Sequence, residues 1–257
     1  MTPAIIQDFL SAFEFIFRAR ESRAGTVQVG GLEEFAFLTA NHLLLSAIAV
    51  AVAVAVAVPI GTYLGHIGRF QFLAVSISNV GRAVPVLALI AFFIAFVGVG
   101  FTNVALVLVL LAIPPILTNA YVGTAQADRD TVDSARGMGL TEGQILTRIE
   151  LPLALPTIFG GVRTSAVNVV ATATIAPYAN VETLGQPIIN FNVYGGTGQL
   201  AAAIVVATIT LAVDASLGGV QRLVTPKGLK LAAQPAGGRR SLLARLPFTP
   251  RRKVQPS

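Results

Sequence analysis

The sequence predicts an all-α membrane protein with about five transmembrane helices. Of its 257 residues, 54% are hydrophobic and only 12% are charged, roughly half the usual charged share of about 25%. A soluble domain of this size needs more charge on its surface, so an ordinary soluble enzyme is excluded, and so is intrinsic disorder. The charges are also sorted, because half of the 18 Lys and Arg residues follow residue 220, where no Asp or Glu occurs.

The first 35 residues form a separate N-terminal segment. Within it, Ile5 to Phe17 is apolar, but Asp8 and Glu14 interrupt the run. Thirteen residues with two acids are too few and too polar to cross a bilayer, which needs about 20 apolar residues. We therefore expect a short interfacial helix here, followed by a transmembrane domain over residues 36–222.

The first three spans come from two charge-free stretches. Phe35 to Gly68 holds no Asp, Glu, Lys or Arg, and we place a span at 43–64. Ala alternates with Val or Ile from Ala47 to Val58. Both alternating faces are apolar and the run is too long for a strand, so a helix with a stripe of small residues is predicted. Two further spans are expected at 73–97 and 103–120, separated by a turn at 98–103 that is rich in glycine.

The second half of the chain alternates polar and apolar stretches. Residues 128–152 are the most charged internal segment and predict a solvent-exposed loop with short helices. Spans are expected at 157–176 and 200–220, joined by a polar connection. Residues 223–257 form a basic tail rich in Pro, Gly and Arg, which we expect to be flexible.

The positive-inside rule orients these spans. The 65–72 connection, the 128–152 loop and the region after residue 220 carry one, three and nine Lys and Arg residues, whereas the connections at 98–103 and 177–199 carry none. The N-terminus is therefore expected outside the cell and the C-terminus inside. The basic tail fits anionic lipid headgroups, and no nucleic-acid partner is expected.

The charged loop contains a motif with regular spacing. A triad is followed after three residues by glycine, after nine more by isoleucine, and after one more by Leu-Pro: Asp133, Ser134, Ala135, Gly139, Ile149, Leu151 and Pro152. This pattern resembles the EAA loop of ABC-importer permeases, with Asp in place of Glu and Ser in place of the first Ala. The glycine fits the C-terminal cap of a short helix, and proline is tolerated in the first turn of the next helix.

The resemblance covers roughly residues 41–221 and implies a type I importer permease with the MetI-like fold. In that family, the short helix of the loop sits in a cleft of the ATPase subunit and transmits its motion. The stretches 79–89, 113–123 and 161–176 resemble permeases for osmoprotectants such as glycine betaine, choline and carnitine. A glycine-rich turn that usually follows the fourth span in those permeases is replaced here by Asn180-Val181-Glu182-Thr183-Leu184-Gly185.

The sequence lacks the motifs and residue types that ATP binding, an aromatic cage and a metal site require. It has no GxxxxGK[ST] phosphate loop, and its three lysines lie in the tail, so we expect no catalytic activity and no cofactor, with ATP bound by a separate ATPase subunit. It has no Trp and only four Tyr, too few for an aromatic cage. Solute selectivity is therefore expected in an extracellular binding protein. No Cys and two distant histidines, His42 and His66, predict no metal site.

Polar residues within the spans are candidates for the translocation pathway. Thr164, Asn168 and Thr172 are four residues apart and share one helix face. They either border the pathway or form interhelical hydrogen bonds. The charged residues Arg82, Arg163 and Asp214 have the same two interpretations, functional or structural.

The sequence thus predicts the membrane subunit of an osmoprotectant importer, multi-pass in the bacterial cytoplasmic membrane. Its expected partners are ATPase subunits, a binding protein, membrane lipid and a second permease copy or a paralogue. The alternatives are an ABC permease for an amino acid or oxyanion, an ion-coupled secondary transporter, or a membrane scaffold that transports nothing. A secondary transporter usually shows repeated halves and buried carboxylates, and here no repeat is evident.

Overall fold

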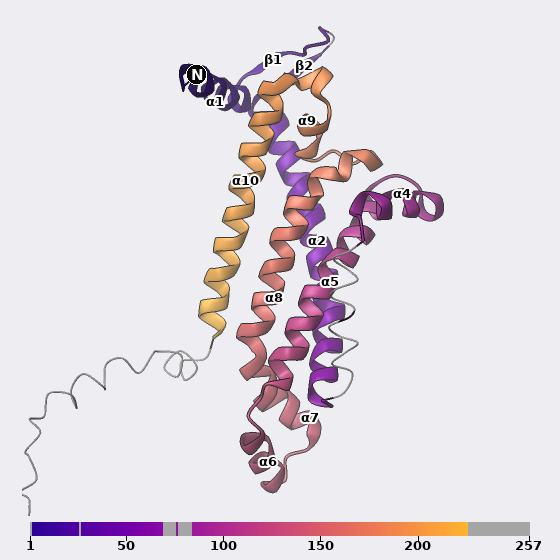
Figure 1. The fold of residues 1–257 in the computed structure, drawn as a ribbon, viewed down its shortest axis with the longest axis vertical. Coiled ribbons are helices and arrows are strands. Elements are labelled where there is room, and N and C mark those ends of the chain that lie inside the picture. The colour runs from indigo at the N-terminus through magenta and orange to yellow at the C-terminus, as the bar shows by residue number, and fades with distance from the viewer. Residues whose placement is uncertain (1, 26, 69–75, 77–83, 226–257) are drawn as a thin grey trace, which may run out of the picture. The chain divides into compact units, whose positions relative to one another are not determined.

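The computed structural model describes residues 2–25, 27–68, 76 and 84–225. The chain divides into two compact units, Met1–Val224 and Thr225–Ser257. From residue 226 onward, the expected flexible tail lies outside the described residues. The elements of the first unit are α1 Thr2–Phe17, β1 Ala19–Glu21, β2 Gln28–Gly30, α2 Gly31–His66, α4 Val86–Val97, α5 Phe101–Ala125, α6 Arg129–Gly137, α7 Glu142–Ile145, the π-helix η1 Leu146–Glu150, α8 Leu151–Thr172, the 3₁₀-helix η2 Ala173–Ala179, α9 Gly185–Ile189 and α10 Phe191–Val224 (Figure 1).

Four helical stretches among the described residues are long and apolar enough to cross a membrane: α2, α5, the continuous stretch Glu142–Ala179 and α10. The fifth, α4, has 12 described residues, about 18 Å of helix. The rest of the predicted 73–97 span, before Val84, lies almost wholly outside the described residues. The all-α membrane class is confirmed, and the short antiparallel pair β1–β2 is an element that the sequence did not predict.

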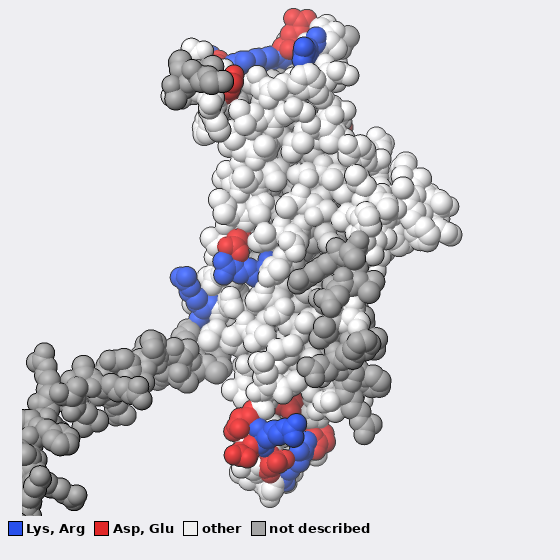
Figure 2. Space-filling view, in the orientation of Figure 1, with Lys and Arg blue, Asp and Glu red and all other residues white. Residues whose placement is uncertain are grey.

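Charged side chains gather at the two ends of these long helices. Figure 2 shows acidic and basic residues around α1 and the β-strands at one end and around α6 and α7 at the other. On the face that Figure 2 shows, the described surface between the ends carries few charged residues, and these lie part-way along. An uncharged belt between charged ends is what a bilayer requires of a multi-pass protein.

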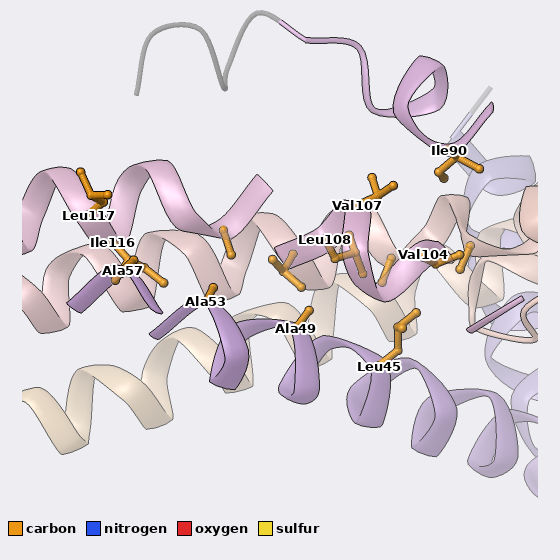
Figure 3. Packing of buried hydrophobic residues seen from close by; sticks show 14 of the residues in the cluster. Leu45, Ala49, Ala53, Ala57, Ile90, Val104, Val107, Leu108, Ile116 and Leu117 are labelled. Carbon is orange, nitrogen blue, oxygen red and sulfur yellow. The ribbon is translucent and has the colours of Figure 1, made fainter. Parts of the chain in front are cut away.

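The α2–α5 pair forms the centre of the bundle. On α2 a buried residue recurs every four positions, and these residues face a row on α5 that includes Val104, Leu108 and Ile116 (Figure 3). The α2 series is Leu45, Ala49, Ala53, Ala57, Gly61 and Gly65. Four-residue spacing keeps side chains on one helix face, so the Ala/Val run is the small-residue stripe that the sequence predicts.

Two glycines bring the lower half of α2 into direct backbone contact with α5. A Cβ at Gly61 would lie 2.6 Å from the carbonyl oxygen of Leu117, and a Cβ at Gly65 would lie 2.6 Å from that of Tyr121. No side chain fits at these distances. In lipid, where helices gain little from hydrophobic association, such close packing is a main source of attraction between them.

The third long helix, α8, is fixed to this pair by polar contacts. The Nε2 atom of buried His42 on α2 lies 2.8 Å from the carbonyl oxygen of Val170. Ser165 donates to the carbonyl of Ala112 on α5 at 2.9 Å. Such bonds satisfy backbone groups that lipid cannot.

The polar connection predicted between the last two spans is largely helical. It contains η2, a left-handed Asn180 and α9, and buried Thr183 donates to the carbonyl of Ala173. α10 begins at Phe191 with a non-helical break at Gly195. Gly and Asn residues there allow tight turns between short helices rather than an extended loop.

Candidate functional site

The 128–152 segment folds into a helical hairpin at the end of the bundle opposite α1 (Figure 1). We call residues 128–150, which comprise α6, α7 and η1, the coupling hairpin. Asp128 caps α6 by accepting from the N–H of Thr131 at 3.2 Å and from its hydroxyl at 2.7 Å. These bonds lower the pKa of the Asp128 carboxyl. Thr141 and Gln144 form a capping box at the start of α7.

Gly139 ends α6 in the left-handed region, with φ at +88°. Its N–H donates to the carbonyl of Arg136 at 2.9 Å, and the N–H of Leu140 donates to the carbonyl of Ala135 at 3.2 Å. This pair of bonds defines a Schellman cap. The three-residue gap between the triad and the glycine is therefore the spacing that places Ala135 and Gly139 at the two key positions of the cap.

The hairpin has a small apolar core, to which the motif contributes Ala135 and Ile149. Val132, Ala135 and Ile145 are buried, and Leu140 and Ile149 pack against them. Asp133 and Ser134 are exposed on the opposite side of α6, as is Met138 at the tip of the hairpin. The motif is thus divided, with Ala135 and Ile149 holding the hairpin together and the acidic end of the triad left free for contact.

The Leu151-Pro152 pair lies where the hairpin joins the membrane helix. α8 begins at Leu151, as the motif predicts, but the helix does not start there anew, because η1 runs into it without a break. Proline lacks an N–H and its ring crowds the carbonyl four residues earlier. The wider π-turn from Leu146 to Glu150 accommodates that ring while the chain remains helical.

A chain of charged side chains joins the hairpin to the bundle. Arg136 contacts Asp133 at 3.0 Å and Glu142 at 2.8 Å. The hydrogen bonds from Arg136 lower the pKa of Glu142, and those same bonds raise the pKa of Arg136. Beyond Glu142, His66 at the end of α2 lies 3.3 Å from Glu142 and 2.6 Å from buried Glu150.

The predicted pathway residues lie on the outer face of α8. Thr164 and Asn168 are exposed and line an open pocket of about 430 Å³, whereas half-buried Thr172 lies one turn further on and is not among its lining residues. Arg163 and Asp214 border the same pocket as a two-bond ion pair between α8 and α10. Arg82, the third charged candidate, lies outside the described residues.

Residues 57–227 match the family described as the inner membrane component of binding-protein-dependent transport systems. The chain belongs to this family. The match begins at Ala57, near the end of α2, and covers the other three long helices and the whole coupling hairpin. This transport component is therefore a multi-pass protein of the cytoplasmic membrane, as the sequence predicts.

Curated relatives of this transport component are named as permeases for carnitine, choline and glycine betaine. It is 36% identical to the carnitine transport permease protein OpuCB of Listeria monocytogenes, over 76% of this chain and 90% of the relative. It is 33% identical to the glycine betaine/carnitine/choline transport system permease protein OpuCB of Bacillus subtilis, over 77% of this chain and 91% of the relative. The resemblance to osmoprotectant permeases is thereby confirmed.

Solved structures confirm the MetI-like fold of the transport component. An inward-facing structure of the MetNI methionine ABC transporter superposes with a TM-score of 0.67 at 18% identity, covering 76% of this chain and 98% of that one. An amino acid ABC transporter superposes with a TM-score of 0.60 at 16% identity, covering 74% and 94%.

Sequence reasoning missed the contacts that attach the hairpin of this transport component to its bundle. Glu150 occupies the variable position between Ile149 and Leu151, so the motif assigns it no role. Its partner His66 is 84 residues away and had been assigned no site. The signals available in the sequence were a histidine at the end of an apolar span and an acid at the start of another, and these do not predict a pair.

Proposed function

We propose that this chain is the permease of an ATP-driven importer for a small osmoprotectant such as glycine betaine, choline or carnitine. The observation that carries the proposal is the coupling hairpin, a capped helix with an exposed acidic face at one end of a membrane bundle. The names of the relatives, which share 33–36% identity over most of the chain, support the choice of solute class.

ATP hydrolysis belongs, in this proposal, to a separate ATPase subunit, because the sequence has no phosphate loop. The exposed residues of α6, with Asp133, Ser134 and Met138, are the surface offered to that subunit. Met138 has 73% of its side chain exposed, and flexible apolar side chains of this kind adapt well to a partner surface. The permease itself requires no cofactor.

The membrane orientation follows from the same arrangement. We place the coupling hairpin and the C-terminal tail in the cytoplasm, and α1 with β1–β2 outside. α1 has buried Ala12 and Phe15 on one side and a row of exposed apolar side chains on another: Ile5, Ile6, Phe9, Leu10, Phe13 and Phe17. It therefore suits an interfacial helix at the outer membrane surface.

The translocation pathway is assigned to the α8–α10 face. Thr164 and Asn168 lie there beside the Arg163–Asp214 pair, and charged groups within a membrane normally face water or protein. A second permease, identical or paralogous, would complete the pathway by facing this surface. An extracellular binding protein would supply the solute and most of the selectivity.

Reconstituted transport tests the proposal. The permease, its ATPase subunit and its binding protein are incorporated into liposomes, and accumulation of labelled glycine betaine, choline or carnitine is measured with Mg-ATP on the ATPase side. We expect uptake of at least one of them that stops with an ATPase lacking its phosphate-loop lysine. Uptake driven by an ion gradient without ATP contradicts the proposal. ATP-driven uptake of only an amino acid or oxyanion corrects the solute class.

A further inference from the structure

Three segments meet around one histidine at the cytoplasmic end of the bundle. His66 is the last residue of α2, Glu142 is the first of α7, and Glu150 is the last of η1. Nδ1 of His66 lies 2.6 Å from a carboxylate oxygen of Glu150, and its Nε2 lies 3.3 Å from one of Glu142. A carboxylate only accepts, so Nδ1 carries the proton in the hydrogen bond to Glu150.

The two contacts differ in their surroundings. The side chains of His66 and Glu150 are 10% and 6% exposed, whereas that of Glu142 is 57% exposed. An exposed ion pair contributes little, but a buried carboxylate without a partner is costly. The His66–Glu150 contact is therefore the strong link, and Glu142 extends it to Arg136 on α6.

Apolar packing does not replace this link. The hairpin core around Val132, Ala135 and Ile145 draws its members only from residues 127–149. Between α6 and the ends of α2 and α5 there is instead a cavity of about 420 Å³, lined by Tyr121, Thr124, Val132, Asp133 and Arg136, and by Gly65, His66 and Glu150 among others. Because this cavity separates α6 from the bundle, the hairpin contacts the end of α2 through the side chains at the edge of the cavity, His66 and Glu150.

The helices of the bundle differ in how they can receive motion from the hairpin. α8 continues from η1 through the backbone, and α5 is joined to α6 by residues 126–128, so any displacement of the hairpin reaches both helices directly. α2 has no such connection and contacts the hairpin through side chains. α2 is also the helix whose Gly61 and Gly65 lock it onto α5, so a link to α2 engages the α2–α5 pair.

We propose that His66 is a positioning residue that fastens the end of α2 to the coupling hairpin, so that displacement of α6 moves α2 together with α5 and α8. The inference rests on the proposed function, in which an ATPase moves α6. Without His66, the hairpin moves α5 and α8 while the end of α2 is held only by its packing on α5, and ATP hydrolysis continues with little solute crossing.

Transport stoichiometry in the reconstituted system tests this role. For His66→Ala and Glu150→Gln, we expect ATP hydrolysis within about twofold of wild type and labelled glycine betaine, choline or carnitine carried per ATP reduced about tenfold. Glu142→Gln should have a smaller effect because that residue is exposed. Arg148→Gln is the matched control, because it removes a charge from η1 at a residue outside the network.

A distance measurement separates a linkage from a general effect on folding. The chain has no cysteine, so spin labels can be placed at exposed Tyr63 on α2 and at exposed Thr147 on η1 of the hairpin, outside the surface offered to the ATPase. In the wild type, the distance between the labels should stay narrow when ATP is added, and in His66→Ala it should broaden only with ATP. His66→Lys, which places a cation beside the two carboxylates, should restore part of the coupling.

The outcomes are distinguishable. A wild-type protein that shows no ATP-dependent uptake contradicts the proposed function, and with it the inference. ATP-dependent uptake by the wild type together with unchanged uptake per ATP in His66→Ala overturns the inference alone. A His66→Ala protein that has a broad label distance without ATP, or that no longer assembles with the ATPase, also overturns it, because His66 would then only stabilise the fold.

Discussion

The backbone N–H of Leu140 donates to the carbonyl of Ala135 at 3.2 Å, closing the cap that ends α6 of the coupling hairpin. Between these two residues, Gly139 has φ at +88°, a conformation that residues with a Cβ adopt at a cost. The Cβ of Ala135 is in the hairpin core and Leu140 packs beside it. One hydrogen bond thus joins the motif triad to its glycine and fixes the direction of the chain.

Replacing Gly139 should disturb this cap through backbone strain alone. A Cβ at Gly139 meets no atom within 4 Å, so Gly139→Ala should cost about 1–2 kcal/mol, the penalty for the left-handed conformation. Gly139→Asp adds a charge and should uncouple ATP hydrolysis from uptake. Gly137→Ala is the matched control, since Gly137 is helical and its Cβ would also be in open space. Comparable uptake per ATP in Gly139→Asp and wild type would contradict the assignment of the hairpin.

Enlarging Gly61 should loosen the centre of the bundle. Its Cβ would lie 2.6 Å from the carbonyl oxygen of Leu117 and 2.7 Å from the Cβ of Ala120, so Gly61→Ala should cost about 1–3 kcal/mol through overpacking. Gly160→Ala places its Cβ in open space and should change stability little. Unfolding of the detergent-solubilised permease by increasing SDS measures both. Equal unfolding midpoints for Gly61→Ala and the wild type would show that the close approach of α2 to α5 at Gly61 does not stabilise the bundle.

Neutralising one member of the Arg163–Asp214 pair should be worse than neutralising both. Arg163→Gln or Asp214→Asn leaves one full charge without its partner within the membrane region, and such a charge is costly. We expect each single variant to lower the yield of folded permease several-fold and the double variant to recover it. Uptake per folded molecule in the double variant separates the two interpretations of the pair. Normal uptake indicates a structural role, and lost uptake indicates a role in the pathway.

The cap at Asp128 gives the hairpin a defined pH dependence. The hydroxyl and N–H of Thr131 lower the pKa of this carboxyl. Because the pKa in the folded state is depressed, the cap stabilises α6 fully above the ordinary Asp value of about 3.9, and its contribution is lost as pH falls through the lowered value. In Thr131→Val, which lacks the hydroxyl, the carboxyl should titrate at higher pH. Carboxyl ¹³C NMR of labelled Asp, with Asp128→Asn identifying the signal, measures the change.

The motif shows how far sequence reasoning reaches in this protein. The cap at Gly139 and the start of α8 at Leu151 were predicted because caps and helix starts depend on residues a few positions apart. The same holds for the small-residue stripe of α2, which is a repeat along a single helix. The π-turn of η1 and the short helices around Asn180 were missed, because both result from how the chain fits against its neighbours.

By itself, the sequence determined the class of this protein, its membrane-spanning stretches and the position of its coupling hairpin. Charge sorting, apolar length and cap spacing are properties of short, contiguous segments, and the bilayer acts on each segment separately. Only the tertiary structure decided that Glu150 meets His66, that Gly61 meets Leu117 and that Arg163 meets Asp214. These contacts depend on how each helix is rotated and how closely it approaches its neighbour, which the packing of all the helices sets together.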